Sequence, residues 1–293
     1  MKGFFLLGVL LAACSSSSQL DAKSPTAATN PALESRIKTL EAENAKYRDD
    51  LEWLHAVHQQ ANAQQAAEDA EEPAPDAMFA VDIAPDLAAG QVDGPSNACV
   101  TIVKAWDFAC PYCAKASAPL EQLVKDYSGK VRIVYKNMVV HPQIAMQAHL
   151  AGCAASKQGK FPEFRHVWWD KAFAAYVAER DPAKLGMDMI MAIAKDLKLD
   201  ATKFKADMAS AQCQQQVEGD MAELAKWHVN ATPTFFINGR SFMWDGTGDS
   251  FKSAIDDELK RVTSSGVSCA DYYQKVVMDK GEKKFRSKKD GKG

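Results

Sequence analysis

Two cysteines separated by two residues, Cys110-Pro-Tyr-Cys113, are the side chains best suited to chemistry in this chain. A C-x-x-C pair can close a disulfide, bind a metal or attach a haem. Haem attachment requires a histidine directly after the second cysteine, and residue 114 is alanine. A zinc site requires further ligands, and the chain has no second C-x-x-C and no H-x-x-x-H. We therefore expect no metal and no cofactor, which leaves a redox-active pair or a structural disulfide.

The residues around the pair predict a strand that leads directly into a helix. Residues 100–108 are apolar and rich in β-branched and aromatic side chains, which is typical of a central parallel strand. Residues 114–126 have helical spacing, so Cys110 falls near the helix N-cap and Pro111 at the first helical position. Free N–H groups at a helix N-terminus favour a thiolate. We expect an exposed Cys110 to attack a disulfide and a more buried Cys113 to resolve the intermediate.

Two segments together resemble the active site of periplasmic DsbA-like oxidoreductases. The first is Trp-Asp-Phe-Ala-Cys-Pro-Tyr-Cys at residues 106–113, and the second, residues 231–240, resembles the cis-proline segment of that family. The resemblance covers roughly residues 78–282. It implies an α/β thioredoxin fold with an inserted helical domain, here preceded by an N-terminal helical stalk.

The resemblance also implies roles for single residues. Thr232 and Pro233 would lie against the cysteine pair and, with Pro111 and Tyr112, form the substrate-binding surface. Backbone beside a cis-proline can pair with an extended substrate like an added strand. One position departs from the family, which often has a buried acid where this chain has Lys104. An ammonium close to the pair would favour the thiolate and the reduced form, whereas one that reaches the surface would do little.

Composition and pattern divide the chain into segments. The expected order is a lipoprotein signal peptide (1–14), a tether (15–32), a helical or coiled-coil stalk (33–72), a linker (73–77), the thioredoxin-fold domain (78–140 and 230–268), the inserted helical domain (141–229) and a C-terminal helix with a basic tail (269–293). Within them we expect strands at 78–83 and 131–138, helices at 142–157, 161–178, 186–198, 201–228 and 249–263, a hairpin at 235–242, and a solvated tail from residue 280. His141 should lie in a loop and His149 and His166 on helix surfaces.

The first residues resemble a lipoprotein signal. Lys2 precedes an apolar run, residues 4–13, that is too short to span a membrane. Leu11-Ala-Ala-Cys14 resembles a bacterial lipobox, in which cleavage leaves Cys14 as the lipid-bearing N-terminus. The alternative is an ordinary secretory signal cut near the same place. Both predict export, where disulfides persist. Ser15 resembles the default for outer-membrane sorting, so we expect a lipid anchor on the periplasmic face of the envelope.

Residues 33–58 carry a repeat with alternating spacings of four and three. Its positions are 33, 37, 40, 44, 47, 51, 54 and 58. The repeat is typical of a short coiled coil, in which a core Asn44 would fix register and oligomer state. The chain would then form a homo-oligomer through residues 33–58. The alternative is an amphipathic helix that folds back on its own catalytic domain.

The remaining cysteines suggest two further disulfides. The chain has seven cysteines, and Cys14 and the C-x-x-C pair account for three. Cys153 and Cys213 both fall on expected helices of the insertion. In a thioredoxin-type fold, the closing helix should bring Cys269 to the end of the sheet where Cys99 begins the central strand. We expect these two pairings, with reduced core thiols as the alternative.

The function hypotheses concern the direction of disulfide exchange. The net charge of −3 gives no sign of nucleic-acid binding. The first hypothesis is an enzyme that forms or isomerises disulfides in exported cysteine-containing proteins. A stalk that links several catalytic domains favours isomerisation, whereas oxidation favours a monomer recharged by a membrane redox partner. The alternatives are an envelope reductase of the same fold and a non-catalytic coiled-coil lipoprotein scaffold with a structural disulfide.

Overall fold

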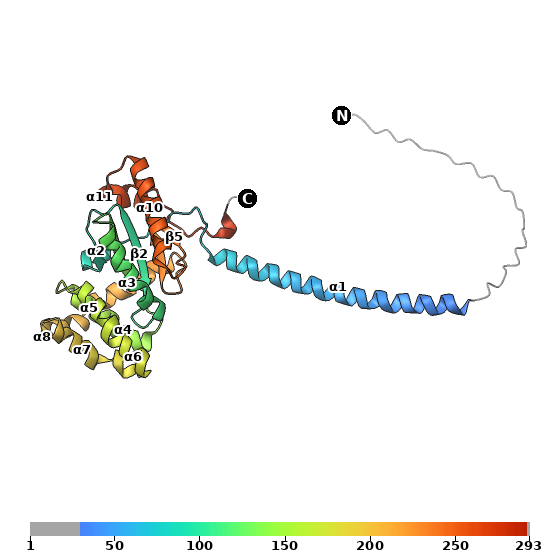
Figure 1. Cartoon of the computed structure of the whole chain (residues 1–293), viewed down its shortest axis with the longest axis horizontal. Helices are drawn as coiled ribbons and strands as arrows, with labels where there is room; N and C mark the ends of the chain where they lie inside the picture. Colours follow the sequence, from blue (N-terminus) through green and yellow to red (C-terminus); the bar gives the residue numbers. More distant parts are fainter. Residues whose placement is uncertain (1–29, 292–293) are drawn as a thin grey trace, which may run out of the picture. The chain divides into compact units, whose positions relative to one another are not determined.

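The computed structural model describes residues 30–291 (Figure 1). The expected signal peptide, most of the tether and Cys14 therefore lie outside the described residues. The chain divides into two compact units, Met1–Asn62 and Ala63–Gly293. Among residues 30–291, no helix combines the length and the apolar character needed to cross a membrane.

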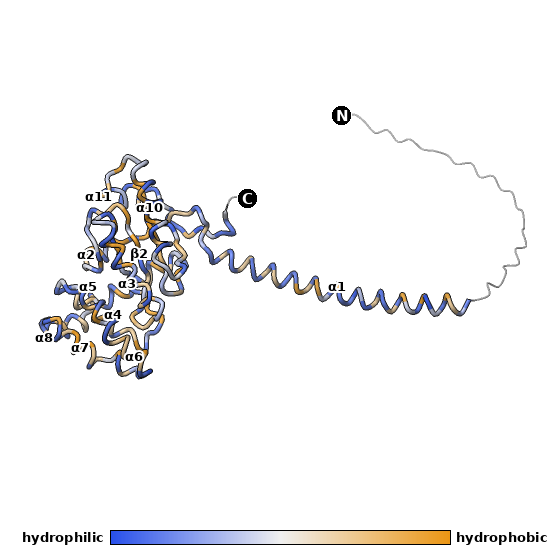
Figure 2. Tube along the Cα trace, in the orientation of Figure 1, coloured by the Kyte–Doolittle hydropathy of each residue, from blue (hydrophilic) through white to orange (hydrophobic). Residues whose placement is uncertain are grey.

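A single helix, α1, runs over Pro31–Glu71. The side chain of Asn30 accepts a hydrogen bond from the N–H of Ala32 and so caps the first turn. Pro31 occupies the first helical position, where its missing N–H costs nothing. None of the residues of α1 is buried. Figure 2 shows apolar segments recurring along α1 between polar ones, as the spacing of its leucines predicts.

The second unit contains a five-stranded sheet in the order β1-β3-β2-β4-β5. Its strands are β1 Val92–Asp93, β2 Val100–Trp106, β3 Val131–Asn137, β4 Thr234–Ile237 and β5 Arg240–Phe242. Strands β2 and β3 are parallel and buried along their whole length, as their apolar sequences predict. Strand β4 runs antiparallel to β2 and places Thr234 opposite Ala105. The expected thioredoxin fold is therefore confirmed.

The hairpin between β4 and β5 turns at Asn238 and Gly239, as expected. Both residues have positive φ angles, of 45° and 78°, which suits the two central positions of a type I′ turn. A Cβ atom at Gly239 would lie 2.4 Å from the carbonyl oxygen of Phe79. Glycine is therefore required at this turn by backbone conformation and by space.

Helices flank the sheet and fill the insertion between β3 and β4. Those of the thioredoxin-fold part are α2 Ala84–Ala89, α3 Pro111–Asp126, α10 Gly248–Ser265, α11 Cys269–Tyr272, the π-helix η3 Tyr273–Met278 and the 3₁₀ helix η4 Lys288–Asp290. The insertion contains α4 Pro142–Ser156, α5 Phe161–Val167, the π-helix η1 Trp168–Phe173, α6 Ala174–Glu179, the 3₁₀ helix η2 Pro182–Leu185, α7 Met187–Asp196, α8 Ala201–Met208 and α9 Ala211–Ala225. The helix expected over 201–228 is broken because the Ser210 hydroxyl caps a new helix by accepting from the N–H of Cys213.

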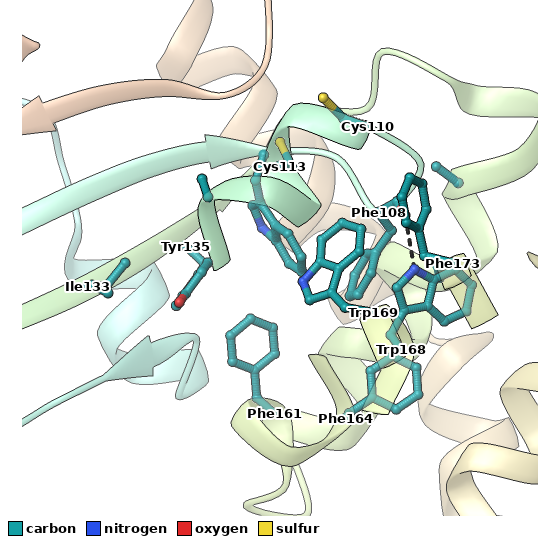
Figure 3. Packing of buried hydrophobic residues seen from close by; sticks show 14 of the residues in the cluster. Phe108, Cys110, Cys113, Ile133, Tyr135, Phe161, Phe164, Trp168, Trp169 and Phe173 are labelled. Atoms are coloured by element: carbon teal, nitrogen blue, oxygen red, sulfur yellow. Dashed lines mark hydrogen bonds between the residues drawn. The ribbon is translucent and has the colours of Figure 1, made fainter. Parts of the chain in front are cut away.

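The main core joins the end of β2 to the insertion through aromatic rings (Figure 3). The ring centroids of Trp106 and Phe108 are 4.2 Å apart, and those of Phe108 and Trp168 are 5.2 Å apart. The indole N–H of Trp168 also donates to the Phe108 carbonyl oxygen, at 2.9 Å. The insertion therefore fixes the backbone that leads into Cys110.

Two expectations about the ends of this unit are wrong. Residues 78–83 form no strand. Phe79 makes an isolated bridge to Glu282, and its N–H donates to the carbonyl oxygen of Gly239, so this segment bonds to the C-terminal residues and the β4–β5 turn. The segment from residue 280 is not a solvated tail. Ser287 is buried and bridges Pro73, so the C-terminal segment packs against the residues that follow α1.

Candidate active site

The cysteine pair lies where β2 passes into α3, as the sequence predicts. Cys110 is the N-cap of α3 in an extended conformation, with φ −84° and ψ 120°, and Pro111 follows at the first helical position. Figure 3 shows both sulfur atoms at this end of α3. Both cysteines are free thiols in this structure. Cys113 is one helical turn away from the N-cap, so the pair is placed to close a disulfide.

The segment around Pro233 covers the pair. The Thr232–Pro233 peptide bond is cis, and the thiol of Cys110 donates to the Thr232 carbonyl oxygen at 3.2 Å. The antiparallel pairing of β4 with β2 brings these distant segments together. Cys110 is only 4% exposed, so the expectation of an exposed cysteine is wrong. The neighbouring Thr232–Pro233 segment leaves little of its surface open.

Hydrogen bonds make Cys110 acidic. The Cys113 thiol, the Thr232 hydroxyl and the backbone N–H groups of Cys113 and Tyr112 donate to its thiolate and lower the pKa of Cys110 to about 5, against the opposing effect of burial. The contact with the Thr232 carbonyl favours the thiol instead, but the donors outweigh it. The Thr232 hydroxyl is buried and makes no hydrogen bond within residues 30–291 while Cys110 is a thiol, so it is free to donate once the thiolate forms.

Cys113 has the opposite character. It is fully buried, and burial together with its hydrogen bond to Cys110 raises the pKa of its thiol well above the usual value. At neutral pH Cys110 is therefore a thiolate and Cys113 is a thiol. This difference suits Cys110 to act as the nucleophile and Cys113 to act as the resolving cysteine.

Lys104 lies beneath the pair rather than at the surface. Its side chain is fully buried, and its Nζ donates to the carbonyl oxygen of Cys113 at 3.1 Å and to the Ser117 hydroxyl at 3.5 Å. Of the two alternatives for this residue, the structure therefore has the ammonium close to the pair.

The carboxylate of Asp107 holds the loop before the pair. It is fully buried and accepts hydrogen bonds from the backbone N–H groups of Ala109 (2.6 Å), Val140 (2.7 Å) and His141 (3.0 Å). These bonds tie the turn before Cys110 to the loop after β3. Sequence reasoning missed this residue, although an acid inside the apolar run that leads into the pair was the available signal.

His149 is buried rather than on a helix surface, so that expectation is wrong. Its Nδ1 lies 2.7 Å from the Asn137 side-chain oxygen, and its Nε2 accepts from the N–H of Phe108 at 3.4 Å. Burial lowers the pKa of His149 to about 4, so the ring is neutral and serves to position the segment before Cys110. His141 lies at the N-cap of α4, and His166 is exposed as expected.

A shallow cavity of about 310 Å³ opens beside the pair. Its walls come from the active-site turn, the cis-proline segment and β5, through Tyr112, Pro233, Thr234, Ser241, Phe242, Met243 and Trp244. Tyr112 is 64% exposed and Met243 is 88% exposed. The structure thus brings Tyr112 and Pro233 together at one apolar surface. Pro111 is exposed at the same helix end.

The family model for thioredoxin matches residues 87–257, which is more than half of the chain and contains the cysteine pair and the cis-proline segment. The chain belongs to the thioredoxin family.

Individual relatives of this thioredoxin-family chain fall into two groups. The Na(+)/H(+) antiporter NhaA 3 of Salinispora tropica is 35% identical over 152 residues, which are 51% of this chain but only 22% of the antiporter. The chain therefore spans about a fifth of the length of such relatives. Disulfide bond formation protein D of Bacillus subtilis is 26% identical over 184 residues, which cover 60% of this chain and 80% of that protein.

Solved structures show that the fold is that of DsbA-like proteins. Oxidised BdbD from Bacillus subtilis superposes with a TM-score of 0.50 at 23% identity and covers 64% of this chain and 99% of its own. The alpha-DsbA1 protein of Wolbachia pipientis superposes with a TM-score of 0.52 at 14% identity and covers 60% of this chain and 93% of its own.

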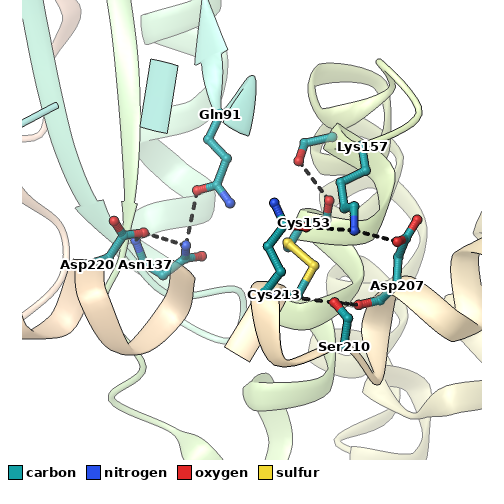
Figure 4. Close-up of a disulfide and its surroundings, with 10 residues drawn as sticks. Gln91, Asn137, Cys153, Lys157, Asp207, Ser210, Cys213 and Asp220 are labelled. Atoms are coloured by element: carbon teal, nitrogen blue, oxygen red, sulfur yellow. Dashed lines mark hydrogen bonds and ion pairs between the residues drawn. A yellow bond between two sulfur atoms is a disulfide. The ribbon is translucent and has the colours of Figure 1, made fainter. Parts of the chain in front are cut away.

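Two disulfides lie away from the active site of this thioredoxin-family chain. Cys153 and Cys213 join α4 to α9 with an S–S distance of 2.01 Å (Figure 4). Cys99 and Cys269 join the residue before β2 to the start of α11, at 1.97 Å. These pairings coincide with those expected from the sequence, and non-reducing peptide mapping is their test.

Proposed function

We propose that this protein is a thiol:disulfide oxidoreductase that forms or isomerises disulfides in exported proteins through Cys110 and Cys113. The observation that carries the proposal is the position of Cys110 at the N-terminus of α3, against Thr232 and beside a buried resolving cysteine. Lowering the pKa of Cys110 stabilises the reduced pair, and a stabilised reduced form makes the disulfide a better oxidant. This favours transfer of the disulfide to a substrate over reduction of one.

Disulfide transfer starts from the oxidised pair. A substrate thiolate attacks Cys110, which forms a mixed disulfide and breaks the bond to Cys113, and Cys113 takes up a proton. A second substrate thiolate then attacks the substrate sulfur and releases Cys110. The low pKa of Cys110 makes it a good leaving group. Two electrons pass from the substrate dithiol to the pair. In the reverse sequence the reduced pair gives two electrons to a wrong disulfide of the substrate, which is reduced, and the Cys110–Cys113 disulfide forms.

The apolar surface beside the pair would bind the substrate. The backbone at Thr232 and Pro233 can pair with an extended segment like an added strand, while Tyr112, Met243 and Trp244 contact its apolar side chains. The substrates would be unfolded exported proteins with free cysteines, in which such segments are exposed.

The predicted leader and stalk support a location of this activity in the envelope. We propose that lipidated Cys14 anchors the chain and that α1 associates with copies of itself through residues 33–58. Leu33, Leu51 and Leu54 are 61%, 65% and 53% exposed on α1, which leaves an apolar seam for a partner helix. Joined catalytic domains would favour isomerisation, whereas a membrane redox partner would recharge the pair for oxidation. The relative named for disulfide bond formation supports the oxidising direction.

Two substitutions test the proposal. Cys110→Ser should abolish exchange with glutathione and renaturation of a scrambled substrate, because it removes the nucleophile. Cys113→Ala should trap mixed disulfides with substrates, because nothing resolves them. A Cys110→Ser protein with full activity would leave only the scaffold interpretation, in which the pair is structural.

A further inference from the structure

The ammonium of Lys104 is buried without a carboxylate partner. Within residues 30–291, no Asp or Glu oxygen lies within 4.0 Å of its Nζ. The buried ammonium of Lys136, by contrast, lies 2.6 Å from Asp86 and 3.3 Å from Asp220. A buried cation without a counter-ion is strongly disfavoured. Lys104 therefore needs an anion from elsewhere or must lose its proton.

Among the groups that face Lys104, only a cysteine thiolate can supply the missing negative charge. On α3 these are Cys110, Cys113 and, further along, Glu121, and on α5 it is Arg165. The carboxylate of Glu121 already pairs with Arg165 at 2.9 Å.

The neighbouring strands add no free charge. Lys104 pairs with Tyr135 on β3 and with Phe235 on β4. Its Nζ lies 5.9 Å from the centre of the Tyr135 ring. Burial raises the pKa of Tyr135 well above the usual value, so this phenol stays neutral. The anion that remains is the thiolate of the cysteine pair, and it exists only while the pair is reduced.

We infer that Lys104 is the charge partner of the active-site thiolate and that it gives up its proton when the pair becomes a disulfide. The inference rests on the proposed function, because it requires a pair that cycles between two redox states. It makes Lys104 a residue that positions charge and exchanges a proton in step with thiol exchange.

Electrons and protons balance in the oxidation step. In the reduced protein Cys110 is a thiolate, Cys113 is a thiol and Lys104 is an ammonium. Formation of the disulfide releases two electrons to a disulfide of the substrate or of a redox partner. It also releases two protons, one from Cys113 and one from Lys104, which becomes a neutral amine. Without Lys104, the same step releases only the proton of Cys113.

The acidity of Lys104 agrees with this role. Burial lowers the pKa of Lys104 to about 8, although the negative charge of the thiolate in the pair acts in the opposite direction. A disulfide carries no charge, so its formation removes that support and lowers the pKa of Lys104 further. Between that lower value and about 8, the lysine is charged in the reduced protein and neutral in the oxidised one.

The test is the pH dependence of the reduction potential of the full chain, measured from pH 6.5 to 7.5. Each proton taken up changes the equilibrium constant tenfold per pH unit, or about 29.6 mV for a two-electron couple. We expect a hundredfold change in the wild type and a tenfold change in Lys104→Met. Lys115→Met, which removes an exposed lysine of α3, is the matched control and should follow the wild type. Equal slopes for the wild type and Lys104→Met would overturn the inference.

A second measurement does not depend on the folding of a variant. In the wild type with ¹³C-labelled lysine, the Cε signal of Lys104 can be identified by its contact with the Tyr135 ring. At pH 7.5 it should report an ammonium in the reduced protein and an amine in the oxidised one. A protonation state that is the same in both forms contradicts the inference alone. A pair that never exchanges with glutathione contradicts the proposed function, and the inference falls with it.

Discussion

At the scale of single residues, the reactivity of Cys110 comes from donors around its sulfur rather than from exposure. Because these donors lower its pKa to about 5, the thiolate should persist well below neutral pH. We expect the rate of alkylation of the reduced protein by iodoacetamide to fall as the pH drops, with a midpoint near 5. Peptide mapping of the alkylated wild type assigns the rate to Cys110, and a midpoint near 8 or 9 would contradict the hydrogen-bond account.

The same pKa shift makes the stability of the reduced protein depend on pH. The pKa of Cys110 is lower in the folded than in the unfolded protein, so its thiolate stabilises the folded, reduced protein above the unfolded pKa. This contribution should be lost as the pH falls from about 9 towards 5. Denaturant titrations of the reduced protein at several pH values should show it. Cys110→Ser should lack this part of the pH dependence, and an identical profile for both proteins would speak against the shift.

The effect of the Thr232 hydroxyl on the pKa of Cys110 can be tested separately from that of the Thr232 backbone. Thr232→Val keeps the shape of the side chain but removes the hydroxyl that donates to the thiolate. The pKa of Cys110 should rise, and each unit of rise reduces the thiolate population about tenfold below the pKa. Thr234→Val, on the neighbouring strand residue whose hydroxyl instead donates to the Ala231 carbonyl, is the control. The alkylation profile distinguishes the two, and no change in Thr232→Val would exclude the hydroxyl as a donor.

Only some of these site residues can be predicted from the sequence. Cys110, Cys113 and Pro233 lie in local motifs, so their place at the site can be inferred from the sequence alone. The burial of Lys104 and His149 cannot, because it depends on how the insertion and α3 pack over β2 and β3. The burial of Cys110 escapes prediction for a similar reason, since its cover comes from Thr232, on a segment far along the chain.

At the scale of elements, local signals decide which parts of the fold the sequence predicts well. The strand-to-helix passage at Pro111 and the Asn238-Gly239 turn each follow from the preferences of a few adjacent residues. The strand expected at 78–83 is absent because the backbone there bonds to the C-terminal segment and to the turn after β4, through Ala80 with Glu282 and Phe79 with Gly239. Pairing of that kind is a long-range property that a short apolar run does not contain.

The disulfide between α4 and α9 should stabilise the insertion. It closes a loop of 60 residues. On the chain-entropy model, replacing Cys153 and Cys213 with Ala should lower the free energy of unfolding by about 4 kcal/mol. Denaturant unfolding of the oxidised protein measures the loss. With the wild type fully reduced by a dithiol, most of the difference should disappear, and an oxidised variant as stable as the wild type would contradict the bond.

At the scale of the whole molecule, we propose that the stalk determines the oligomeric state of the chain. The first unit ends at Asn62, and the residues after it make contacts with the catalytic part, such as that of Asp69 with Lys288 at 3.0 Å. Deletion of residues 33–62 should therefore leave a folded monomer that keeps thiol exchange and has weaker isomerase activity. Sedimentation of the soluble full chain and of the deletion variant measures this. A full chain that already sediments as a monomer would contradict the coiled coil.

The core asparagine offers a sharper change in the same helix. In a coiled coil, Asn44→Ile should raise the stability of the assembly and alter its oligomer state, because it removes the polar core residue that fixes register. A helix that folds back on its own domain should show no change in mass. Sedimentation of this variant beside Asp49→Asn, a change at an exposed position away from the repeat, distinguishes the two arrangements.

The central claim is that the Cys110–Cys113 pair passes its disulfide to another protein. The direct measurement mixes one equivalent of the oxidised full chain with a reduced, unfolded substrate protein and counts thiols on both by mass spectrometry after alkylation. We predict that the substrate loses two thiols while Cys110 and Cys113 gain two, and that Cys110→Ser transfers none. A pair that stays oxidised while the substrate thiols remain unchanged would contradict the account.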